Sequence, residues 1–114
     1  MLNNVILIGR TVEDLKVVTT ESGLKTCRMV LACQRPFKNQ ETQEYDTDFI
    51  PVILWQAVAE MTSQYVKRGS TVAVKARLAT RTIDIENIKV RTVEVIGERV
   101  IFINLKYEEN QGEN

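Results

Sequence analysis

The stretch RPFKNQETQEYDTDFIPVILW, which begins at Arg35 and ends at Trp55, places aromatic rings in two different settings. Phe37 lies between Arg35 and Lys38 in a polar, turn-prone segment, whereas Phe49 and Trp55 lie in the apolar run that follows. A ring in a polar loop has little core to enter, but it can stack on a nucleic-acid base for roughly 1–3 kcal/mol while neighbouring cations hold phosphates. The stretch therefore predicts a surface that binds unpaired nucleic acid through base stacking and charge.

Each of these rings also has a purely structural interpretation. Phe37 could anchor a loop that folds back onto the protein. Phe49 and Trp55 could belong to the core, because a large ring on a strand is usually buried. Pro51 between them cannot donate to a ladder, which suits a strand with one face in the core and the other facing a ligand, but composition alone does not decide. Tyr65 follows a helical spacing, so we expect it in the core.

One segment in the second half of the chain is locally rich in cations. Residues 67–91 contain seven cations and two acidic residues, although the whole chain balances 15 basic against 15 acidic residues. Lys75, Arg77 and Arg81 alternate with an inward-facing apolar series that ends at Leu78, so they line one face of a strand. Such a face is usually only solvated, but beside stacking rings it favours phosphate contact. The full candidate set is Arg10, Arg28, Arg35, Lys38, Lys75, Arg77 and Arg81.

The sequence offers little for catalysis. It contains no histidine and only two cysteines. Ser-His-Asp and Cys-His arrangements are therefore impossible, and the imidazole ligands common at metal sites are missing. Cys27 and Cys33 could be reactive thiols, but they alternate with Met29 and Leu31 in an apolar pattern that favours burial. We expect no enzyme activity, no metal site and no cofactor.

The same two cysteines bear on the compartment. In a strand they would lie about 20 Å apart, which is too far for a disulfide. The chain shows no signal-peptide pattern and no apolar run near ~20 residues. These features predict a reducing, cytoplasmic location and no membrane segment.

The elements that must position the rings are predicted to be five or six strands and one helix. Strand patterns occur at residues 4–9, 27–33, 45–55, 70–81, 89–96 and 100–105. Apolar residues at helical spacing cover residues 58–66, and Gly69 follows as the expected C-cap of a helix. One helix between the third and fourth long strands describes an all-β, five-stranded Greek-key barrel of the OB type, which binds oligonucleotides or sugars across one face.

Four segments taken together resemble the bacterial and phage single-stranded-DNA-binding (SSB) family. They are MLNNVILIGR, TDFIPVILWQAVAEMTSQYVKRGS, ARLATR and TVEVIGERVIF, and the resemblance covers about residues 1–105 in order. It implies an OB-fold protomer of a homotetramer, a dimer of dimers, that coats single-stranded DNA without sequence preference in replication, recombination, repair or DNA uptake. Phe37, Phe49 and Trp55 occupy positions at which the family stacks bases. Residues 2–8 are expected to pair between protomers.

The chain departs from the family pattern at three places. Ile83 stands where the family commonly has an aromatic residue, so one stacking platform is expected to be lost. The hairpin IDIENIK is short and lacks the usual glycine-containing loop. The chain ends at GEN without the acidic tail that recruits partner proteins, which indicates a shorter paralogue, a phage type or a truncated protein.

The predicted organisation is an OB-fold, DNA-binding domain over residues 1–106 and a disordered tail over residues 107–114. The protein is expected in the cytoplasm, associated with the nucleoid, with replication or recombination proteins as possible partners. Two alternatives stay open: an OB-like barrel whose exposed rings contact other proteins, and a barrel that prefers RNA.

Overall fold

Six strands and one helix follow one another in the computed structural model of the chain, which describes residues 1–107. They are β1 (Val5–Thr11), β2 (Val18–Thr19), β3 (Lys25–Lys38), β4 (Tyr45–Trp55), α1 (Gln56–Tyr65), β5 (Thr71–Ile85) and β6 (Ile88–Asn104). The segments predicted at 89–96 and 100–105 belong to one strand, β6, because its ladder with β5 continues through an irregularity beside Gly97. Of the predicted tail, only Tyr107 lies within the described residues.

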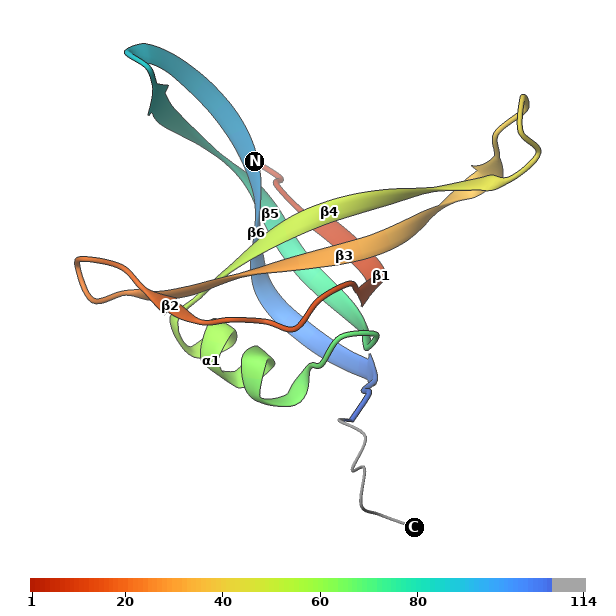
Figure 1. Cartoon of the computed structure of the whole chain (residues 1–114), viewed down its shortest axis with the longest axis horizontal. Helices are drawn as coiled ribbons and strands as arrows, with labels where there is room; N and C mark the ends of the chain where they lie inside the picture. Colours follow the sequence, from red (N-terminus) through yellow and green to blue (C-terminus); the bar gives the residue numbers. More distant parts are fainter. Residues whose placement is uncertain (108–114) are drawn as a thin grey trace.

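The five long strands close into a barrel, which confirms the predicted OB fold (Figure 1). Their order is β1-β5-β6-β4-β3, and β1 pairs back to β3 to close the ring. The β4–β6 pairing is parallel, and the other pairings are antiparallel. The helix α1 lies below the barrel in Figure 1, between β4 and β5 in the chain.

Closure of the barrel depends on Gly9 in β1. A Cβ atom at this position would come within 2.8 Å of the carbonyl oxygen of Ala32 and 2.9 Å of Sγ of Cys33. A glycine in a strand commonly marks such a close backbone approach. The absence of a side chain at Gly9 therefore allows β1 to reach β3.

The core forms from alternate residues of the strands and from one side of α1. Its buried apolar side chains are Cys27, Met29, Leu31, Val52, Leu54, Ala59, Val66, Val72, Val74, Ala76, Ile96 and Val100. This confirms the inward parity predicted for β3 and for the first half of β5, and it shows that Val52 and Leu54 are on the inward face of β4, a choice that composition left open. The prediction that Leu78 also faces inward is wrong, since 45% of it is exposed. Leu78 keeps the parity of Ala76, but Ala76 is the last β5 residue that pairs with β1, so Leu78 lies where β5 leaves the barrel and continues as the β5–β6 arm.

Two predictions about the helix are also wrong. The helix ends at Tyr65, and its cap is Val66, whose N–H donates to the Thr62 carbonyl at 2.8 Å. Gly69, with φ of 89°, instead lies in the following turn and donates to the Thr11 carbonyl. Tyr65 is 53% exposed rather than buried, because it lies beside the buried stripe of α1 and only packs against Phe102 at a ring separation of 6.0 Å.

Two hairpins project from the barrel as arms on different sides (Figure 1). The β3–β4 arm turns at residues 39–44, and the β5–β6 arm turns at Glu86 and Asn87. Both residues of the second turn have positive φ, 49° and 67°, which is the type I′ geometry of a two-residue hairpin. The short IDIENIK hairpin predicted from the sequence is thus the tip of a longer arm.

Candidate nucleic-acid interface

Phe37, Phe49 and Trp55 all face outward from the barrel. Their exposed fractions are 64%, 63% and 38%. Phe49 and Trp55 lie on the outward parity of β4, whereas Val52 and Leu54 on the other parity are fully buried. The structure therefore excludes the alternative that these two rings belong to the core.

Phe37 lies in the last part of β3 rather than in the polar loop that the sequence predicts around it. The β3–β4 register is regular up to Gln34 opposite Thr47 and resumes at Lys38 opposite Tyr45. Between these pairs, β3 has three residues and β4 has one, so β3 bulges. The bulge places Phe37 out on the arm, where it does not fold back onto the barrel.

Arg10 shares a row of the outer face with a ring, and Arg28 lines the same groove as Trp55. In one row, Arg10 of β1 lies opposite Ala32 of β3, which lies opposite Phe49 of β4. In a second row, Arg28 of β3 lies opposite Ile53 of β4. Directly opposite residues in an antiparallel pair lie on the same face. The predicted juxtaposition of rings and cations is thus present at Arg10 and Arg28.

A groove with a volume of about 550 Å³ runs beside Trp55. Residues of five strands and of the segment between β1 and β2 line it, among them Arg28, Ile53, Trp55, Arg81 and Glu94. A second groove of about 190 Å³ includes Pro51 and shares Arg28, Ile53 and Glu94 with the first. The lining includes one ring and three cations but also the carboxylates of Glu13, Asp14 and Glu94, so the groove can hold an unpaired base beside Trp55 while its charges are balanced.

Four of the seven predicted cations are already paired with carboxylates. Nη2 of Arg81 lies 2.9 Å from Glu94, while Lys75 and Arg77 converge on Glu98 at 3.0 and 3.4 Å. The fourth is Arg35. The other three, Arg10, Arg28 and Lys38, have no ion pair within residues 1–107. Nζ of Lys38 instead lies 5.9 Å from the centre of the Tyr45 ring.

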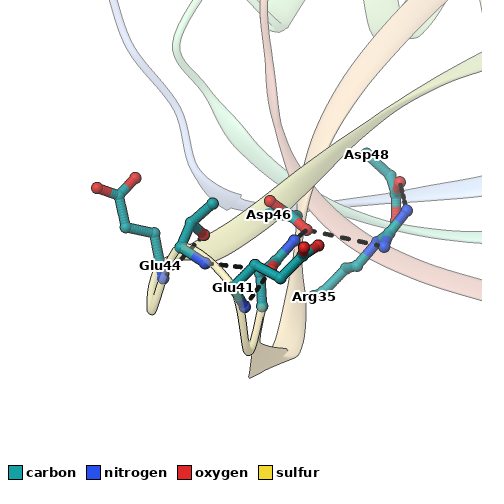
Figure 2. A network of polar contacts seen from close by, with 7 residues as sticks. Arg35, Glu41, Glu44, Asp46 and Asp48 are labelled. Carbon is teal, nitrogen blue, oxygen red and sulfur yellow. Dashed lines mark hydrogen bonds and ion pairs between the residues drawn. The ribbon is translucent and has the colours of Figure 1, made fainter.

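Arg35 is held by two carboxylates of β4, as Figure 2 shows. Its Nε and Nη2 donate to the two carboxylate oxygens of Asp48 at 3.0 and 2.9 Å, and Nη1 lies 3.9 Å from Asp46. The hydrogen bond from Arg35 lowers the pKa of Asp48 below its ordinary range, and the same pairing raises the pKa of Arg35. The pair is therefore fully charged at neutral pH.

Some candidates lie away from the rings. Lys75 is opposite Ile6 of β1, and neither Lys75 nor Arg77 lines the grooves. Ile83 is half-buried on the β5–β6 arm, opposite Val90, so this position offers an aliphatic surface and no ring. Sequence reasoning missed Glu94, since nothing in its local pattern indicates that it meets Arg81.

Neither cysteine is placed as a reactive thiol. Cys27 is buried, Cys33 is half-buried, and both are free thiols. Burial raises the pKa of each thiol, and the nearby Asp48 carboxylate raises that of Cys33 further. Within the described residues, no group of three or more metal-ligating side chains comes together. The same part of the chain contains no helix long and apolar enough to cross a membrane.

The chain matches the model of the single-strand binding protein family over residues 2–103, and it belongs to that family. It is 37% identical over 113 residues to a single-stranded DNA-binding protein of Halalkalibacterium halodurans, a match that covers 98% of this chain and 67% of the relative. It is 36% identical to the protein of the same name from Oceanobacillus iheyensis, covering 93% of this chain and 66% of that relative.

The fold is similar to that of a solved relative. The crystal structure of the wild-type single-stranded DNA binding protein from Thermus aquaticus matches with a TM-score of 0.77 and 26% sequence identity. The match covers 90% of this chain and 50% of the Thermus chain. This chain therefore spans about two thirds of the two sequence relatives and half of the solved one.

Proposed function

We propose that the chain binds single-stranded DNA without sequence preference and protects it during replication, recombination, repair or DNA uptake. The observation that carries this proposal is the exposure of Phe37, Phe49 and Trp55 on neighbouring strands, together with cations that have no ion pair within residues 1–107 and a groove beside Trp55. Every base has a π-face, so stacking on these rings tolerates any sequence. The names of the relatives support the same ligand. The proposed function includes no catalytic step.

The seven cations divide into two groups in this proposal. Arg10, Arg28 and Lys38 contact phosphates directly, since no carboxylate of residues 1–107 has to be displaced. Lys75, Arg77, Arg81 and Arg35 contact a phosphate only if it replaces or joins their carboxylate partners. Neutralisation of each phosphate releases counterions, so binding is expected to weaken with salt.

The proposed active form is a homotetramer, a dimer of dimers, in the cytoplasm and associated with the nucleoid. Ile6 and Ile8 on β1 are 62% and 60% exposed, and Ile101 on β6 is 47% exposed. Ile8, Ala73 and Ile101 form one row across β1, β5 and β6. This uncovered apolar row supports pairing of protomers through β1, which would join several barrels into one path for DNA. Replication or recombination proteins are proposed as further partners.

The test is a titration of the chain with poly(dT) and with poly(U) at two salt concentrations, followed by Trp55 fluorescence and light scattering. The expected result is quenching by poly(dT), weaker binding at the higher salt and the mass of a tetramer. No quenching, together with protein binding that is insensitive to salt, would instead indicate a protein-interaction module. Tighter binding of poly(U) than of poly(dT) would indicate an RNA-binding barrel.

A further inference from the structure

The backbone around Phe37 has lost the support of a regular ladder. Arg35, Pro36 and Phe37 of β3 face the single residue Asp46 of β4 in the bulge. Pro36 also has no N–H to donate. The position of the Phe37 ring therefore depends on side-chain contacts that fix the bulge.

Arg35 and Asp48 supply such a contact. The two hydrogen bonds from Nε and Nη2 of Arg35, at 3.0 and 2.9 Å, engage both carboxylate oxygens of Asp48. A bidentate pair of this kind fixes geometry as well as charge. Arg35 lies two residues before Phe37, and Asp48 immediately precedes Phe49. The pair thus joins the two backbone segments that carry the exposed rings.

The polar contacts continue from this pair to the tip of the arm (Figure 2). Asp46, 3.9 Å from Nη1 of Arg35, accepts a hydrogen bond from Nδ2 of Asn39 at 3.1 Å. Oδ1 of Asn39 in turn accepts from the backbone N–H groups of Glu41 and Thr42 at 2.8 and 3.3 Å. A continuous network therefore connects the β3–β4 ladder with the turn beyond Phe37.

We propose that Arg35 and Asp48 are a positioning pair, which holds Phe37 at the spacing from Phe49 that base stacking requires, and that Arg35 is not itself a phosphate contact. This inference rests on the proposed DNA binding. A phosphate would have to replace the Asp48 carboxylate to use the same two donors of Arg35. Replacement would release the bulge at the moment when Phe37 must hold a base.

Substitution of Asp48 separates the two roles, because they predict opposite signs. If Asp48 only competed with phosphate, Asp48→Asn would free Arg35, remove a negative charge and tighten DNA binding. A positioning pair predicts that Asp48→Asn and Arg35→Gln each weaken binding by a similar factor, about three- to tenfold, and that the double variant is no weaker than either single variant. Both effects should disappear in a Phe37→Ala background.

The measurement is the anisotropy of a labelled oligo(dT) titrated with each variant at several salt concentrations. The slope of log K against log salt should match the wild type in both single variants. Glu60→Gln is the matched control, since it removes one negative charge and one exposed ion pair, that of Lys25, and its affinity should stay at the wild-type value. Tighter binding by Asp48→Asn, or a slope reduced by about 0.7 in Arg35→Gln, would overturn the proposal.

A readout without DNA distinguishes failure of this inference from failure of the proposed function. NMR order parameters of the Phe37 and Lys38 amides should fall in both Arg35→Gln and Asp48→Asn, from about 0.85 toward 0.6, and remain unchanged in Glu60→Gln. Unchanged values in Arg35→Gln and Asp48→Asn would overturn the positioning role. If the wild-type chain does not bind oligo(dT), the proposed function fails, while the order parameters still decide whether the pair fixes Phe37.

Discussion

Phe49 lies directly across the β3–β4 ladder from Ala32. A large residue at this cross-strand position would pack over the ring, because directly opposite side chains are close neighbours. With alanine there, Phe49 keeps 63% of its surface exposed. The small residue opposite the ring is therefore as much a part of the candidate interface as the ring.

This relationship predicts that Ala32→Leu weakens DNA binding even though every ring and cation is retained. The leucine would cover part of Phe49, and the expected loss lies below that of Phe49→Ala, for which a lost stacking partner corresponds to about 1–3 kcal/mol. Titration of labelled oligo(dT) measures both variants, and thermal unfolding checks that each is folded. Unchanged affinity of a folded Phe49→Ala variant would remove this ring from the interface.

Arg28 should contribute one phosphate contact, since it lines both grooves and has no ion pair among the described residues. Arg28→Gln is expected to weaken binding and to reduce the slope of log K against log salt by about 0.7, the value for one phosphate on a single strand. Lys106→Gln, which removes the same charge outside both grooves, is the control. An unchanged slope in Arg28→Gln would show that Arg28 does not neutralise a phosphate.

The sequence was sufficient to predict the barrel, the helix after Trp55 and the exposure of Phe37, whereas the local pattern left the exposure of Phe49 and Trp55 open. These properties depend on local patterns: the change from strand to helix spacing after Trp55, the alternation in β3, and an aromatic residue placed among cations at Phe37. The family resemblance also gave the identities of the three rings, and the structure places all three on the outer surface.

Other features depend on contacts between residues of different strands, which a local sequence pattern does not reveal. Glu94 and Arg81 are 13 residues apart in the chain, and they meet because β5 and β6 pair in one register (94 − 81 = 13). Arg35 and Asp48 meet through the β3–β4 register in the same way. The bulge at Phe37 and the point before Leu78 at which β5 leaves the barrel decide which side chains are exposed, and neither has a reliable sequence signal. Which cations of the candidate surface are paired with carboxylates was therefore not predictable from the sequence.

Gly9→Ala tests the closure of the barrel. The added Cβ would meet the Ala32 carbonyl oxygen at 2.8 Å, and backbone cannot move aside as a flexible side chain can. Overpacking of this kind costs about 1–3 kcal/mol, so urea unfolding should show a free energy of unfolding reduced by that amount. Glu21→Ala in the exposed turn after β2 is the control, with an expected change within about 0.5 kcal/mol. Equal stability of Gly9→Ala and the wild type would show that β1 and β3 can separate at no cost.

The pairing of Asp48 predicts a particular pH dependence. Arg35 lowers the pKa of Asp48 below its ordinary value of 3.8. Between the lowered pKa and the ordinary one, the folded chain therefore binds fewer protons than the unfolded chain. The stabilisation is complete above the ordinary pKa and is lost as the pH falls through the lowered pKa. An NMR titration of the carboxyl carbon should therefore show a higher midpoint for Asp48 in Arg35→Gln than in the wild type. The same midpoint in both proteins would contradict the pairing.

The two thiols allow a direct test of the rival hypothesis that the chain is a thiol enzyme. Burial raises the pKa of Cys27 and of Cys33, so little thiolate forms at neutral pH, and the thiolate is the nucleophile. Alkylation of the native protein should therefore be slower at both cysteines than in the urea-unfolded chain, and slowest at the buried Cys27. Mass spectrometry of iodoacetamide-treated samples gives the two rates. Rapid modification of Cys27 in the native protein would require an exposed, low-pKa thiol, contrary to its position inside the barrel.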